Sequence, residues 1–155
     1  MANRGIGGDT SRGLLFRFQE DALDLKPKAL VMCIGTNDLS AHGDPAGIVA
    51  NIAAMVAAAR KQDPALPIVL CRIPPRDSDK APMKPGAFDD LNRRIAEYGA
   101  GKERLAVLDL FTLLAGPDGK PVAECFADDH LHLAAPGYAK WAAALKPVLE
   151  KLGVR

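Results

Sequence analysis

The chain has few cysteines and few aromatic residues. Three of its 155 residues are cysteine, and 5% are aromatic. No two cysteines stand at the C-x-x-C spacing typical of zinc and redox motifs, and Cys33 and Cys71 lie inside apolar runs. We therefore expect small buried side chains at these positions, and neither a disulfide framework nor a zinc site.

The chain also lacks a charge excess and long apolar runs. Its 20 Lys and Arg residues against 19 Asp and Glu leave a net charge of +1, without the basic cluster that nucleic acid or an anionic membrane would require. No apolar run approaches the roughly 18 residues of a spanning helix. The start "MANRGIGG" contains no apolar segment of a signal peptide. The sequence therefore predicts no nucleic-acid partner and no membrane span, and it indicates no compartment.

Three short apolar runs, at 29–35, 67–73 and 104–110, are continuous rather than alternating. This pattern is typical of strands that are buried on both faces of a parallel sheet. Apolar residues at helical spacing lie between and around the runs, at 14–25, 48–56, 88–98 and 141–152. We expect the first helix to open at Asp9, Thr10 or Ser11 and to stop by Pro27, and the second to begin at Asp44-Pro45.

This alternation of helix and strand predicts one α/β domain over residues 1–155, with right-handed crossovers and a mostly parallel sheet. In such sheets the ligand site lies at the carboxyl ends of the strands. The segments that follow the three strands are 35–38, 74–86 and 111–133. The segment 74–86 is a candidate substrate rim.

Acids and histidines gather in the stretch "DDHLHL", at 128–133. Asp129 and His132 can meet across a turn, so that the carboxylate holds one ring nitrogen while the other faces a hydroxyl. This arrangement suits a general base with its orienting acid. The alternative is a metal site made from Asp128, Asp129, His130 and His132.

Two further segments could bind negative charge. The glycine-rich "NRGIGGDTS" (3–11) leads into a helix, so its amide N–H groups could face an anion or an oxyanion. In "CIGTND" (33–38), the neutral Asn37 side chain is a suitable donor to an oxyanion. The alternatives are a flexible loop with a helix cap for the first segment and an Asx turn for the second.

Taken in this order, "NRGIGGDTS", "IGTND" and "DDHLHLAAPGY" resemble the second, third and fifth conserved blocks of the SGNH hydrolases, also called the GDSL esterase/lipase family. The similarity runs over essentially the whole chain. It implies a flavodoxin-like, three-layer α/β/α fold. It also implies hydrolysis of small-molecule esters through a Ser-His-Asp triad, without a metal or another cofactor.

The resemblance also assigns roles by position. Gly8 matches the glycine whose backbone N–H lines the oxyanion hole, and Asn37 matches the asparagine that donates from its side chain. Asp129 and His132 match the acid and the base of the D-x-x-H block. His130 occupies a variable position in that block and is expected at the edge of the pocket.

The chain departs from the family at the first block, an apolar strand followed by G-D-S with the nucleophilic serine. Its only serines are Ser11, Ser40 and Ser78, and none follows an apolar strand in that setting. "GGDTS" mimics the motif, but its place assigns it to the second block, which disfavours Thr10 and Ser11 as nucleophiles. We therefore expect the first strand and its serine to be missing, and the chain to be a truncated and inactive esterase.

Two other functions stay open on the sequence. One is a non-catalytic relative that binds an acyl or carbohydrate ligand. The other is a flavodoxin-like anion or nucleotide binder that uses "GIGGDT" (5–10) as a phosphate cradle. A missing strand would also leave an open sheet edge, which favours association of copies of the chain.

Overall fold

The structure is a computed structural model that describes residues 2–77 and 83–154. Its described sheet has three parallel strands in the order β1-β2-β3. The strands are β1 (Leu30–Met32), β2 (Ile68–Arg72) and β3 (Leu105–Asp109). Each strand lies inside one of the apolar runs, so the predicted parallel sheet is confirmed.

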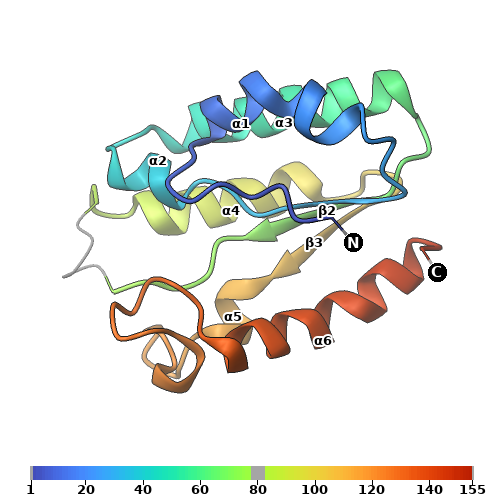
Figure 1. The fold of residues 1–155 in the computed structure, drawn as a ribbon. Coiled ribbons are helices and arrows are strands. Elements are labelled where there is room, and N and C mark those ends of the chain that lie inside the picture. The colour runs from blue at the N-terminus through green and yellow to red at the C-terminus, as the bar shows by residue number, and fades with distance from the viewer. Residues whose placement is uncertain (1, 78–82, 155) are drawn as a thin grey trace.

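Helices cover both faces of the sheet (Figure 1). One face carries α1 (Ser11–Phe18) with the π-helical turn η1 (Gln19–Leu23), α3 (Pro45–Gln62) and α4 (Ala87–Gly99). The other face carries α5 (Leu110–Leu114) and α6 (Ala135–Lys151). Two short helices, α2 (Thr36–Ser40) and the 3-10 turn η2 (Ala123–Cys125), complete the described elements. The arrangement is the predicted three-layer α/β/α fold.

Strand β2 shows why the apolar runs are continuous. Ile68 and Leu70 pack into a cluster with the residues of α3 and α4, whereas Val69 and Cys71 pack into a second cluster with those of α5 and α6. All four side chains are at most 2% exposed. Successive side chains of a strand point to opposite faces, so a strand between two helical layers needs apolar residues at every position.

The helix starts follow the expected capping chemistry. The Asp44 carboxylate accepts a hydrogen bond from the Gly47 N–H at 3.0 Å, and Pro45 occupies the first helical position. Thr10 caps α1 by accepting from the Gly13 N–H at 3.2 Å. The α1 segment ends before Pro27, because its helix widens into the π turn and closes at Asp24, whose N–H donates to Gln19.

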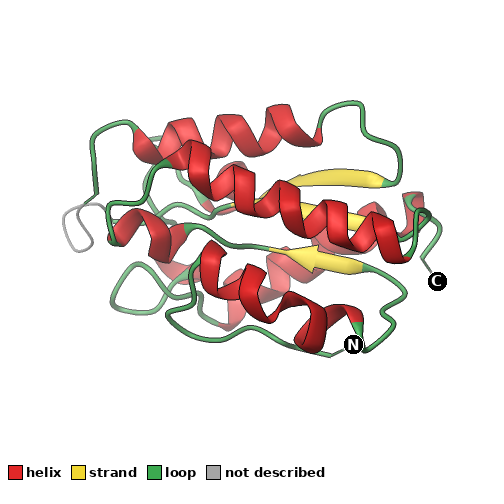
Figure 2. Cartoon of the chain, turned by 90° about the horizontal axis from the view of Figure 1, so that it is seen from above, coloured by secondary structure: helices red, strands yellow, loops and turns green. Residues whose placement is uncertain are grey.

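Strand β1 lies at one edge of the described sheet (Figure 2). Within the described part of the chain, it pairs with β2 alone, and Val31 at its centre is 39% exposed. The described segments that directly follow the three strands gather at one end of the molecule, where α2 and α5 lie (Figure 1). None of the described helices is long and apolar enough to cross a membrane.

Candidate active site

Beyond the carboxyl ends of the strands, the strongest candidate for a functional group is the pair formed by Asp129 and His132. Nδ1 of His132 lies 2.6 Å from Oδ2 of Asp129, and Oδ1 of the same carboxylate accepts from the backbone N–H groups of Leu131 and His132, both at 2.9 Å. The hydrogen bond from the His132 side chain and these two backbone bonds hold the pKa of Asp129 well below its ordinary value of 3.8. A charged acceptor at Nδ1 keeps the proton on that nitrogen, so Nε2 is left as the basic atom.

Nε2 of His132 is open to solvent. The His132 side chain is 76% exposed, and Nε2 has no hydrogen-bond partner among residues 2–77 and 83–154. The nitrogen can therefore take a proton from a hydroxyl or a water molecule that approaches from outside. The structure thus brings together the two side chains that the D-x-x-H pattern pairs.

The structure also links the segments that carry the two predicted oxyanion donors, Gly8 and Asn37. Gly8 sits in a turn closed by the bond from the Asp9 N–H to Ile6, at 3.2 Å, and its φ of 79° is the left-handed conformation that favours glycine. The Gly8 N–H donates to no other described residue. The Asn37 side-chain amide donates to the carbonyl oxygen of Asp9, the residue after Gly8, at 2.9 Å.

The backbone before α2 places Asn37. Gly35 has a φ of 123°, and a Cβ atom there would lie 2.7 Å from Leu91 Cδ2 and 3.3 Å from Ile48 Cγ2. Both the conformation and the close approach of α4 and α3 therefore require glycine. This turn directs the chain from β1 into α2, with Asn37 as the second residue of the helix.

A buried polar cluster, absent from the sequence-based prediction, joins the two donor segments. The Asp38 carboxylate is 8% exposed and accepts from the Ser11 N–H at 2.8 Å and from the Ser11 hydroxyl at 2.6 Å. The Asn51 amide donates to the same hydroxyl at 2.9 Å. A buried carboxylate requires such donors, so Asp38 fixes the start of α1 against α2.

The hydroxyl groups show which residues do not serve His132. Ser11 is fully buried and engaged by Asp38, and Thr10 Oγ1 caps α1. Ser40 is exposed and donates to the Thr36 carbonyl at 3.2 Å. Ser78 lies outside the described residues, as do residues 78–82 of the predicted substrate rim at 74–86. No hydroxyl of a described residue bonds to Nε2 of His132.

The described parts of the chain contain no cluster of side chains that would support the alternative of a metal site. No group of three or more His, Cys, Asp or Glu side chains is placed there to hold a metal ion. The cysteines are free, with Cys71 and Cys125 buried and Cys33 partly buried. The hydrogen bond with Cys33, followed by burial, raises the pKa of the Cys71 thiol. Of the two cysteines in the apolar runs, Cys71 is buried as expected, whereas Cys33 is only partly buried.

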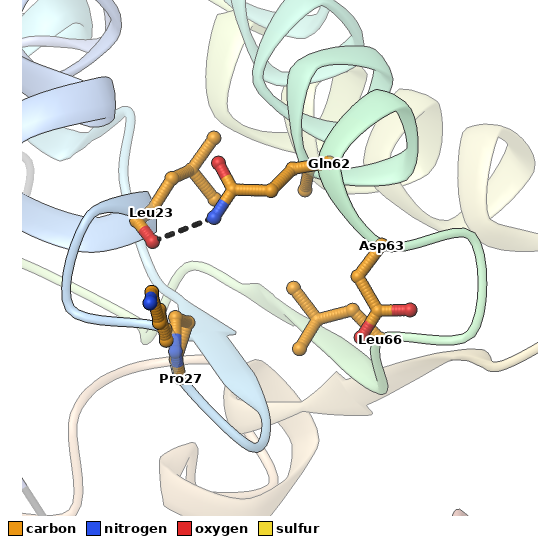
Figure 3. A pocket seen from close by; sticks show the side chains of 7 residues that line it. Leu23, Pro27, Gln62, Asp63 and Leu66 are labelled. Carbon is orange, nitrogen blue, oxygen red and sulfur yellow. Dashed lines mark hydrogen bonds between the residues drawn. The ribbon is translucent and has the colours of Figure 1, made fainter.

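A cavity of about 330 Å³ lies at the opposite end of the sheet. It is lined by Leu23, Lys26, Pro27, Ala59, Gln62, Asp63 and Leu66. Figure 3 shows the lining side chains and the hydrogen bond, 2.8 Å long, that the Gln62 side chain donates to the Leu23 carbonyl. These residues precede β1 and β2, whereas ligands of parallel sheets bind beyond the carboxyl ends of the strands. The candidate site is therefore the group of loops after the strands.

Comparison with known proteins agrees with this geometry. The model of the GDSL-like lipase/acylhydrolase family matches residues 1–140. The platelet-activating factor acetylhydrolase IB subunit alpha1 of Bos taurus is 30% identical over 156 residues, and the match covers 97% of this chain and 63% of the relative. The alpha2 subunit of Rattus norvegicus is 31% identical over 155 residues, with 97% and 64% covered. The chain thus spans a little less than two thirds of the length of these relatives.

Solved structures with similar folds include members of the same family. A GDSL-like lipase from Bacteroides thetaiotaomicron superposes with a TM-score of 0.81 at 26% identity, over 95% of this chain and 74% of that one. A lipase/acylhydrolase from Enterococcus faecalis superposes with a TM-score of 0.78 at 26% identity, over 93% and 72%. Both similarities extend over nearly all of the present chain.

Proposed function

Because the chain belongs to the GDSL-like lipase/acylhydrolase family, we propose that it supplies the general base and the oxyanion donors of a site that hydrolyses carboxylic esters. The observation that carries this proposal is the 2.6 Å hydrogen bond that Nδ1 of His132 donates to Oδ2 of Asp129, which leaves an exposed, basic Nε2. Gly8 and Asn37, whose segments are linked by the bond from Asn37 to Asp9, support the proposal as donors to the ester carbonyl oxygen.

In the proposed reaction, Nε2 of His132 takes the proton of an attacking hydroxyl while Asp129 holds the ring and stabilises the imidazolium. The hydroxyl oxygen adds to the ester carbonyl carbon, and the negative charge that develops on the carbonyl oxygen is met by the Gly8 N–H and the Asn37 amide. The imidazolium then gives its proton to the leaving alkoxide. Water, deprotonated by the same nitrogen, releases the acid from the acyl-enzyme.

The attacking hydroxyl is assigned to none of the described residues, because Ser11, Thr10 and Ser40 are held in other contacts. We propose that it is the serine of a strand followed by Gly-Asp-Ser, in keeping with the family pattern. The names of the two mammalian relatives contain the word acetylhydrolase. We accordingly propose a small-molecule ester with a short acyl group as substrate.

The proposal is tested by joining a segment with an apolar strand, Gly-Asp-Ser and a helix ahead of residue 1. We expect this grafted chain to hydrolyse p-nitrophenyl acetate, and we expect the serine-to-alanine change in the graft, His132→Ala and Asp129→Ala each to abolish or strongly reduce turnover. A grafted chain that shows native-like circular dichroism and cooperative unfolding, yet no turnover, would contradict the proposal.

A second function is supported by the observation that no hydroxyl of a described residue bonds to Nε2 of His132. In that case the chain binds an acyl ligand through Gly8 and Asn37 and does not cleave it. Binding of acetate by the grafted chain without any turnover of the ester would support this function over hydrolysis.

We also propose that copies of the chain associate through the edge of β1. Within the described residues this edge pairs with no strand, and Val31 is exposed there. Unpaired N–H and C=O groups at a sheet edge are a template for another strand.

A further inference from the structure

Arg76 is a charged residue in a buried position next to the candidate site. It is 8% exposed, and this burial lowers the pKa of its guanidinium. Nη1 donates to the Thr36 carbonyl at 2.9 Å, and Nη2 donates to the Ser40 hydroxyl at 3.0 Å. Thr36 and Ser40 are the first and last residues of α2. One side chain therefore holds both ends of the helix that carries Asn37.

The residue after Arg76 contacts the other half of the site. The Asp77 N–H donates to the His130 carbonyl at 3.3 Å. His130 lies between Asp129 and His132 and has a left-handed φ of 54°. Two consecutive residues of the loop after β2 thus touch the helix of the oxyanion donor and the turn of the base.

The start of this loop is itself fixed. Asn92 of α4 is 1% exposed, and its side chain accepts from the Ile73 N–H at 2.8 Å and donates to the Ile73 carbonyl at 3.2 Å. Ile73 directly follows β2 and precedes Arg76 by three positions. The sheet and α4 therefore anchor the segment from which Arg76 and Asp77 reach the two halves.

We propose that Arg76 is a positioning residue that sets the separation between Asn37 and His132, through α2 on one side and the Asp77–His130 contact on the other. The inference rests on the proposed function, in which both groups act on one acyl carbon. Acyl transfer requires the oxyanion donor and the base within about 3 Å of the reacting atoms, and a displacement of about 1 Å can cost roughly 100-fold in rate.

The test uses the 155-residue chain and acetate, which resembles the acid product. Acetate is titrated at about pH 5 and about pH 8, the range over which histidine side chains in general gain and lose charge. Its dissociation constant is read from the NMR signal of the Asn37 side-chain amide. If His132 faces the bound anion, its positive charge strengthens binding, and linkage predicts about 5-fold or more tighter binding at the lower pH.

The ratio of the dissociation constant at about pH 8 to that at about pH 5 is called the pH ratio. Arg76→Gln should reduce this pH ratio to the value that His132→Ala shows. The His132→Ala baseline is needed because Asp128, Asp129 and His130 of the same turn and Asp77 opposite also carry or change charge near the site. Arg76→Lys should retain part of the ratio, because one ammonium group can still reach one of the two acceptors.

Arg60 provides a matched control. It also donates to backbone carbonyls, those of Leu66, Glu103 and Arg104, but these lie at the amino ends of β2 and β3. Arg60→Gln should lower the melting temperature as Arg76→Gln does, and it should leave the pH ratio unchanged. Ser40→Ala is a milder probe, since it removes one acceptor of Arg76 from an exposed position, and should lower the ratio partially.

The outcomes separate the two proposals. A pH ratio that persists in Arg76→Gln, or in Ser40→Ala if the first variant does not fold, overturns the role of Arg76 and leaves the proposed function standing. If the unchanged chain binds acetate equally well at both pH values, His132 does not face an anion bound near Asn37. That result contradicts both proposals.

Discussion

The side-chain amide of Asn37 donates to the backbone carbonyl of Asp9 at 2.9 Å, across 28 positions of the sequence. A primary amide has two N–H groups, so one fixes the orientation of the amide plane and the other stays available. The accepting carbonyl belongs to Asp9, the residue after Gly8. The N–H of Gly8 itself donates to no described residue. The bond therefore fixes the Asn37 amide against the residue next to Gly8 before any ligand binds. Such fixed donors are what the proposed oxyanion hole requires.

The first prediction concerns Asn37 in the grafted chain described above. Asn37→Ala should lower kcat for p-nitrophenyl acetate by about 100-fold to 1,000-fold, because one oxyanion donor is lost. Asn3→Ala removes another amide side chain from an exposed position and should change kcat less than twofold. Equal kcat values for Asn37→Ala and the unchanged graft would show that Asn37 holds the Asp9 turn without touching the substrate.

The second prediction concerns the 155-residue chain without a graft. Its hydrolysis of p-nitrophenyl acetate should not exceed that of His132→Ala, because no described hydroxyl is bonded to Nε2. Progress curves for the two proteins at equal concentration make the comparison. Turnover that depends on His132 would reveal a nucleophile within these residues.

The strands and the Asp129–His132 pair could be predicted because their signals are local. A continuous apolar run needs only neighbouring residues to be recognised, and a carboxylate three positions before an imidazole can meet it within one turn. Asn37 was selected by its place after an apolar strand, and the resemblance to the family blocks then assigned roles to both Gly8 and Asn37. The structure links Asn37 to the residue after Gly8. The catalytic roles of all four residues stay predictions.

Arg76 and the cluster of Ser11, Asp38 and Asn51 could not be predicted in the same way. Their bonds join positions 27 to 40 residues apart, between elements that meet only after the sheet forms. In the sequence, Arg76 stands in a polar loop, where a charged residue normally faces solvent. Its burial results from the packing of that loop against α2, which no local pattern records.

The third prediction concerns the titration of Asp129. Its hydrogen bonds lower its pKa, so the carboxylate should stay ionised as the pH falls through the ordinary value of 3.8 and become protonated only below it. The orienting bond to His132 is present above this midpoint and is lost as the pH falls through it. The ¹³C shift of the side-chain carboxyl gives the midpoint. In His132→Ala it should move up towards 3.8, and an unchanged midpoint would mean that the backbone donors alone cause the shift.

The fourth prediction concerns Asn92, which holds the start of the loop after β2. Asn92→Ala leaves the buried N–H and carbonyl of Ile73 without their partners, and each loss costs about 1–3 kcal/mol. The free energy of unfolding in urea should therefore fall by about 2 kcal/mol or more, whereas the exposed Asn3→Ala should change it by less than about 0.5 kcal/mol. Similar values for the two variants would show that water replaces the Asn92 side chain.

The fifth prediction concerns the open edge of β1. If copies pair there, the weight-average mass from sedimentation equilibrium should rise with protein concentration, and Val31→Lys should abolish this rise, because a lysine on an edge strand opposes pairing with another strand. Phe16 of α1 is 93% exposed, so Phe16→Lys removes an apolar side chain of the surface and leaves the edge intact. This control should still associate. Loss of association in Phe16→Lys, with Val31→Lys unaffected, would place the contact on α1. Edge-to-edge pairing depends on the backbone groups that flank Val31, so a change on the surface of a helix should not disturb it.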